Sequence, residues 1–150
     1  MEYSQGALIS TQPFDYAPGE QEVEKASNGY LISLIAIKAG LPFPVFNLLA
    51  TLIFYLGNRK STYFVRWHCT QLLFLQLTLF VINGIAFIWT MLIIFGDFTV
   101  TNHYLAYIIT MLAFNAIEYV VTIYTAVRTR KGDHIVWWFY GSLAQQICKP

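Results

Sequence analysis

Residues 67–96 read WHCTQLLFLQLTLFVINGIAFIWTMLIIFG and contain no Asp, Glu, Lys or Arg. A helix rises about 1.5 Å per residue, so roughly 20 residues cross a hydrocarbon layer about 30 Å thick. This run is therefore long enough to span a membrane. Because a spanning segment must satisfy its own backbone hydrogen bonds, helix is favoured over the strands that aromatic and β-branched residues suit in water. The stretch predicts a transmembrane helix.

Two other windows are nearly free of charge. Residues 30–56 contain Lys38 as their only charged residue, and residues 98–127 contain only Glu118. Each window is long enough to cross a bilayer by the same arithmetic. The sequence therefore predicts an all-α fold, an integral membrane helical bundle. Its three transmembrane helices are expected at about residues 30–56, 67–96 and 102–127.

The composition supports a membrane protein. Hydrophobic residues make up 57% of the 150-residue chain and charged residues only 11%. A typical soluble domain has about 25% charged and about 45–50% apolar residues, and a small soluble protein has a large surface to cover. The composition excludes a soluble globular enzyme, an acidic disordered chain and a basic nucleic-acid binder. The lipid bilayer is the expected partner, and no nucleic acid is.

The first window is the least regular, because Gly40, Pro42 and Pro44 lie at its middle. Each proline removes a backbone donor and crowds the preceding turn. The simpler interpretation is one spanning helix with a proline kink. The alternative is a re-entrant hairpin of two half-helices, at residues 30–40 and 45–56. A broken helix at membrane depth requires that the freed backbone groups face protein or water.

The two ends of the chain differ from the spans. Residues 1–29 are rich in Gly, Pro, Ser, Gln and acidic residues, which predicts a flexible acidic tail before a transmembrane domain at residues 30–150. Residues 135–147 are apolar but too short to span. They contain Trp137 and Trp138 and follow a basic run. Aromatic residues beside basic ones belong at the headgroup level, so we expect an interfacial amphipathic segment here.

Loop charges predict the orientation, because Lys and Arg favour the cytoplasmic side. Basic residues gather between the first two windows and after the third. In the connection between the second and third windows, Asp97 is the only charged residue. These basic residues are Arg59, Lys60, Arg66, Arg128, Arg130 and Lys131. The count predicts the N-terminus outside and the C-terminus in the cytoplasm, in a bacterial or organelle inner membrane. A re-entrant first window would instead place the tail in the cytoplasm.

Polar residues inside the spans form two narrow stripes. One stripe comprises Asn115, Glu118, Thr122, Thr125 and Thr129, and the other comprises Cys69, Gln76, Asn83 and Thr90. At about 100° per residue, the members of each stripe share one helix face. Such faces turn towards the bundle interior or a cavity rather than lipid. They predict interhelical hydrogen bonds, or alternatively a hydrated path.

Glu118 is the strongest candidate for a functional or packing role within the spans. A bare carboxylate at this depth costs a few kcal/mol, so it should be protonated, paired or hydrated. Our hypothesis is that Glu118 pairs with Lys38 or hydrogen-bonds Gln76, and so fixes its helix against the others. Asn115 and Asn83 complete the candidate set. No catalytic, cofactor-binding or metal-ligating group is expected, because His68, His103 and His134 stand in separate segments without ligand spacing.

The segment YFVRWHCTQLLFLQ, at residues 63–76, resembles the Tic-twenty-like superfamily of small polytopic membrane proteins, which includes a chloroplast inner-envelope import component and bacterial relatives. The resemblance depends on Arg66, His68, Gln71 and Gln76 and extends over about residues 30–140. It implies an inner-membrane protein in which Arg66, His68 and Gln71 shape a helix entry, with no catalytic site. It also implies a link to protein translocation.

The sequence therefore predicts a non-enzymatic integral membrane subunit or scaffold of a larger assembly, linked to protein translocation. Its expected partners are other membrane subunits or further copies of itself, because a three-helix bundle encloses little interior. The alternative is an oligomeric channel or carrier. The polar path of that channel would be lined by Glu118, Asn115, Asn83 and Gln76.

Overall fold

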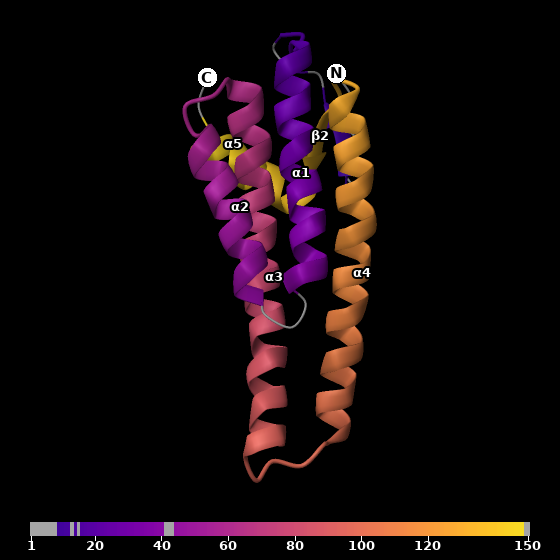
Figure 1. The fold of residues 1–150 in the computed structure, drawn as a ribbon. Coiled ribbons are helices and arrows are strands. Elements are labelled where there is room, and N and C mark those ends of the chain that lie inside the picture. The colour runs from indigo at the N-terminus through magenta and orange to yellow at the C-terminus, as the bar shows by residue number, and fades with distance from the viewer. Residues whose placement is uncertain (1–8, 13, 15, 41–43, 149–150) are drawn as a thin grey trace.

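The computed structural model describes residues 9–12, 14, 16–40 and 44–148. Two long antiparallel helices, α3 (Tyr63–Phe95) and α4 (Asn102–Arg130), run the length of the molecule (Figure 1). Both are long and apolar enough to cross a membrane. They correspond to the predicted second and third spans. The hydroxyl of Thr101 accepts a hydrogen bond from the backbone N–H of Tyr104 (3.3 Å) and so caps the start of α4.

The predicted first span is not one continuous helix. Its residues are divided between α1 (Glu20–Gly40) and α2 (Pro44–Asn58), which turns back beside α1. This division follows from the Gly and Pro residues at the middle of the window, as in the hairpin alternative. The two helices approach closely at Gly29, where an added Cβ would lie 2.8 Å from the ring of Phe54. The three-span count is therefore not confirmed.

Short elements close one end of the bundle. Strand β1 (Ile9–Gln12) pairs antiparallel with β2 (His134–Trp137), with Ile9 opposite Trp137. Helix α5 (Trp138–Ile147) follows β2 directly. The segment expected to be a flexible tail thus contributes a strand and the first turns of α1. Because β1 and β2 are hydrogen-bonded, the two described ends of the chain lie at the same end of the bundle (Figure 1). The orientation in the membrane stays a prediction.

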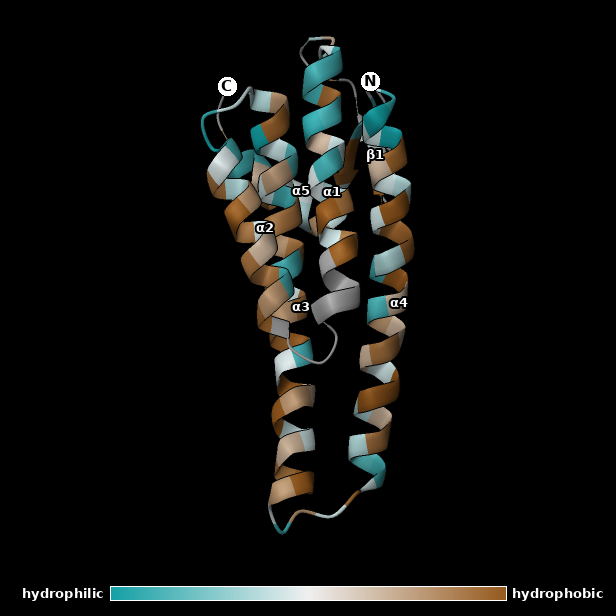
Figure 2. Ribbon diagram, in the orientation of Figure 1, coloured by the Kyte–Doolittle hydropathy of each residue, from teal (hydrophilic) through white to brown (hydrophobic). Residues whose placement is uncertain are grey.

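The core lies in the half of the molecule that contains all five helices. Its main cluster consists of Tyr30, Leu72, Leu75, Leu79, Ala126, Ile135 and Trp137. In the other half only α3 and α4 are present, and their outer faces are apolar and exposed (Figure 2). A soluble protein would bury such faces, whereas lipid accepts them. The molecule is therefore polar and well packed at one end and apolar at the other.

The contact of α5 with α3 depends on the absence of a side chain at Gly141. A Cβ there would collide with Cγ1 of Val136 and would lie 3.3 Å from Oε1 of Gln71. We expect Gly141→Ala to destabilise the protein by about 1–3 kcal/mol, because the packed neighbours must shift. Thermal unfolding in detergent measures this. Gly84→Ala is the matched control: apart from its own helix backbone, no atom of the described residues lies within 4 Å of the added Cβ, so an unchanged or higher midpoint is expected.

Candidate functional site

Gln76 joins the four helices α1 to α4 through one buried side chain. Its Oε1 accepts a hydrogen bond from Nδ2 of Asn47 in α2. Its Nε2 donates to Oγ of Ser33 in α1 (2.7 Å) and to Oε1 of Glu118 in α4 (3.1 Å). Gln76 is 1% exposed and Glu118 5% exposed. We call these four residues the Gln76 hub. A buried amide that satisfies both its donor and its acceptor in this way fixes the relative positions of the helices.

The hub contains one of the two partners expected for Glu118. Gln76 donates to Oε1 of Glu118, and the hydroxyl of Thr122, one turn along α4, donates to the same oxygen (3.0 Å). Within the described part of the chain, the other oxygen, Oε2, has no hydrogen-bond partner. Lys38 falls in α1, but its side chain lies outside the described residues, so the expected pairing with Lys38 stays a prediction.

Further along the bundle, the two polar stripes meet again. Asn83 and Asn115 donate to each other reciprocally, over 3.1 Å and 2.8 Å. The hydroxyls of Thr90 and Tyr104 lie 2.9 Å apart. Both pairs join α3 to α4 in the half of the molecule without other helices. Gln76, Asn83, Asn115 and Glu118, which are the candidate channel-lining residues, thus bond one another in pairs across the α3–α4 interface.

A second buried network lies near the start of α3. Nε2 of Gln71 donates to the hydroxyl of Tyr30 (3.1 Å), which lies 3.0 Å from Nδ1 of His68. Nε2 of His68 lies 3.3 Å from Nδ1 of His134 in β2. One polarity satisfies every contact: Gln71 donates to Tyr30, Tyr30 to His68, and His68 to His134. The chain of donors therefore links α1, α3 and β2 with both histidines neutral.

The side chain of Gln71 also binds backbone groups of β2. Its Oε1 accepts from the N–H of Trp137 (3.0 Å), and its Nε2 donates to the carbonyl oxygen of Ile135 (3.2 Å). The indole N–H of Trp137 donates to the hydroxyl of Thr125 in α4 (2.9 Å). All of these side chains are buried. The polar groups of β2 are thus satisfied by helices, which positions β2 and, through it, β1.

His134 sits among aromatic rings. The ring centroids of Trp67 and Phe14 lie 4.2 Å and 4.7 Å from that of its imidazole. Burial among these apolar groups disfavours the charged form and lowers the pKa of His134 from its ordinary value of 6.5 to about 4. The imidazole therefore stays neutral at neutral pH, in keeping with its place as an acceptor from His68.

The low pKa of His134 predicts a loss of stability in acid. Between pH 6.5 and about 4 the unfolded chain binds a proton that the folded chain excludes, so the free energy of unfolding falls as the pH falls. A complete shift corresponds to about 3 kcal/mol. Thermal unfolding in detergent across this pH range measures the effect. His134→Gln cannot take up the proton and should show a flatter pH dependence; equal slopes for the two proteins would contradict this account.

The predicted helix-entry residues have distinct surroundings. His68 and Gln71 are buried in the network with Tyr30 and His134, whereas Arg66 is half-buried and its carbonyl oxygen accepts from the hydroxyl of Thr70 (2.8 Å). No local pattern indicates that His68 and His134 meet, because they are 66 residues apart. Asn47 and Ser33 were also missed as partners of Gln76. The only feature of the sequence that could have indicated these partners is that Ser33 and Asn47 are polar residues within an apolar window.

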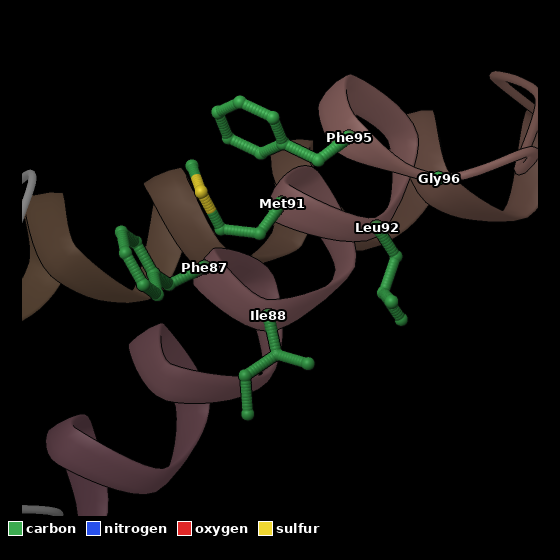
Figure 3. A pocket seen from close by; sticks show the side chains of 6 residues that line it. All are labelled: Phe87, Ile88, Met91, Leu92, Phe95 and Gly96. Carbon is green, nitrogen blue, oxygen red and sulfur yellow. The ribbon is translucent and has the colours of Figure 1, made fainter.

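Within the described residues, no group of three or more His, Cys, Asp or Glu side chains is placed to hold a metal ion. A shallow hollow lies beside the end of α3, between Phe87 and Gly96 (Figure 3). Figure 3 shows Phe87, Met91 and Phe95 projecting to one side of the helix and Ile88 and Leu92 to the other. The lining is hydrocarbon and sulfur, so it suits acyl chains and offers no group for polar chemistry.

The comparisons with known proteins identify the family. No curated protein and no solved structure matches the chain. One family model matches residues 26–142, from the first turns of α1 to α5. It is not a Tic-twenty-like family, so the predicted resemblance is wrong and the predicted link to protein translocation has no support. The chain belongs to the MamF/MmsF family, the magnetosome magnetite crystal formation protein family.

Proposed function

We propose that this chain is a non-enzymatic integral protein of the magnetosome membrane and serves as a structural subunit of the assembly in which magnetite crystals form. The family description supports the membrane and the process. The two long apolar helices support integration into the bilayer. The proposal replaces the translocation role expected from the sequence and keeps the expected scaffold role.

The main support for the proposal is that polar side chains of α3 and α4 hydrogen-bond one another. Gln76 bonds Glu118, and Asn83 bonds Asn115, so that the polar groups hold the helices to one another. Interhelical hydrogen bonds of this kind each contribute about 0.6 kcal/mol in a membrane. A channel would instead direct them towards a water-filled path. The pairing therefore favours a structural role over the oligomeric channel.

The charges support an orientation for this subunit. Arg59, Lys60, Arg128 and Arg130 lie at the end of the bundle that contains β1, β2 and α5, whereas the connection from α3 to α4 contains only Asp97. Since basic loops favour the cytoplasm, both described ends of the chain face the cytoplasm and the α3–α4 connection faces the magnetosome interior. Two crossings are consistent with this arrangement.

Fractionation of a magnetite-forming bacterium tests the proposal. A tagged copy of the chain should be enriched in magnetically purified organelles relative to the cytoplasmic membrane and should resist extraction by alkaline carbonate. The control is an unrelated two-span protein with the same tag, which should remain in the cytoplasmic membrane. An equal distribution of the tagged chain between the two membranes would contradict the magnetosome role, and extraction by carbonate would contradict membrane integration.

A further inference from the structure

The exposed apolar face of α2, the second helix of the α1–α2 hairpin, is about half as long as a membrane is thick. Exposed apolar residues of α2 run from Val45 to Leu56, a distance of about 17 Å at about 1.5 Å per residue. The hydrocarbon layer of a bilayer is about 30 Å thick. Exposed apolar residues of α4 run from Leu105 to Val127, about 33 Å. Thus α4 spans the whole layer, and the apolar face of α2 covers one leaflet.

Hydrogen bonds fix the depth of the hairpin against the long helices. Asn47 in α2 and Ser33 in α1 both bond Gln76, which lies in the middle part of α3. At the other end of the hairpin, Arg59 and Lys60 follow α2, at the same end of the bundle as Arg128 and Arg130 after α4. These basic residues mark one headgroup layer. The hairpin therefore begins at that layer and ends near the middle of the bilayer.

The protein consequently has two different widths. In one leaflet four helices lie together, and in the other only α3 and α4 continue (Figure 1). A helix with its side chains is about 10 Å across, so the cross-section roughly doubles between the two leaflets. Helix α5 contacts α3 at the wide end and exposes Trp138 and Phe139 there, as an interfacial helix does. This helix widens the same leaflet further.

From this shape we infer that the protein is a wedge that binds curved membrane in preference to flat membrane, with its wide end in the convex leaflet. A bilayer bent around a small vesicle has more area in its convex leaflet than in its concave one, and the wide end fills that excess. The inference rests on the membrane integration and orientation proposed above. In a closed magnetosome the convex leaflet faces the cytoplasm, which is where the basic wide end is placed.

Lipid acyl chains surround the narrow half of the protein in this arrangement. The hollow beside Phe87, Met91 and Phe95 is lined by apolar side chains, and Val81, Ile85 and Ile109 are exposed at the same half of the molecule. Acyl chains fit such a surface. A second copy of the chain packed here would widen the narrow half and remove the wedge. This alternative is an outcome of the test.

The test uses the full chain reconstituted into vesicles of one phospholipid mixture at two diameters, about 50 nm and about 400 nm. We expect about threefold more protein per unit of lipid area on the small vesicles. External trypsin should cut after Arg59, Lys60, Arg130 or Lys131 in a larger share of the molecules on the small vesicles, because the wide end faces outward there. Equal densities and equal cleavage, in protein that resists carbonate, would overturn the wedge while leaving membrane integration intact. Protein that carbonate extracts would overturn both.

Two matched variants test whether the α1–α2 hairpin causes the preference for small vesicles. Val45→Asp places a carboxylate on the exposed face of α2 near the middle of the bilayer, whereas Leu56→Asp places one on the same helix at the headgroup layer. A charge at the bilayer centre costs several kcal/mol and should draw the hairpin outward. The density ratio should therefore fall to about one for Val45→Asp and stay near threefold for Leu56→Asp. If Val45→Asp does not fold, the ratio of wild-type density on small vesicles to that on large vesicles tests the wedge by itself. Equal densities together with a crosslinked dimer would show that a copy fills the narrow half.

Discussion

Replacing Gln76 with Leu lowers the thermal unfolding midpoint of the detergent-solubilised protein by about 10 °C. Three interhelical hydrogen bonds are lost, to Asn47, Ser33 and Glu118. Each contributes up to about 1.7 kcal/mol in a membrane protein, and partners left unpaired in a buried position add a cost. A total of about 3 kcal/mol corresponds to roughly 6–12 °C in a chain of this size.

Thr78→Val is the matched control for this variant. Thr78 is on the same helix, but its hydroxyl donates within that helix, to the carbonyl oxygen of Phe74 (3.1 Å). Its replacement should therefore leave the midpoint within about 2 °C of wild type. Differential scanning fluorimetry in a mild detergent gives both values. A midpoint for Gln76→Leu as high as that of Thr78→Val would mean that the Gln76 hub does not stabilise the bundle.

The second large effect is expected for Gln71→Leu, which should release β2 and with it β1. The variant leaves the backbone N–H of Trp137 and the carbonyl of Ile135 without their partner, and it removes the donor to Tyr30. Each buried group left unpaired costs about 1–3 kcal/mol. We expect local opening to become about 2 kcal/mol easier, which is roughly a 30-fold increase in the open population.

Chymotrypsin measures this opening, because the aromatic residues Phe14 and Tyr16 follow β1 directly. Phe14 packs against Phe64 and His134 in the closed protein. Cleavage there should be about 30 times faster in Gln71→Leu when opening is rapid relative to cleavage. Gln145→Leu changes the same residue type at an exposed position of α5 and should cleave at the wild-type rate. Equal rates for all three proteins would show that Gln71 does not hold the strands.

Local sequence patterns could predict the long helices and their contacts but not the closure of the bundle. Helices α3 and α4 were predictable because long runs with no charge, or with Glu118 alone, have few alternatives in lipid. The meeting of Gln76 with Glu118 and of Asn83 with Asn115 follows from polar residues repeated on one face of each helix.

By contrast, β1 and β2 are short, lie more than a hundred residues apart, and alternate in no way that marks them as strands. The meeting of His68 with His134 depends on that pairing, so no local pattern could indicate it. The division of residues 30–56 into α1 and α2 was one of two interpretations of the Gly and Pro residues there. Proline alone does not distinguish a kink from a reversal, because the outcome depends on what the freed backbone contacts.

The pairing of β1 with β2 also orders the biosynthesis of the protein. Residues 9–12 leave the ribosome more than a hundred residues before their partners at residues 134–137. At synthesis rates of about 5–20 residues per second, β1 waits roughly 6–25 s for β2. Until β2 is made, β1 keeps an unpaired strand edge, which can pair with another chain.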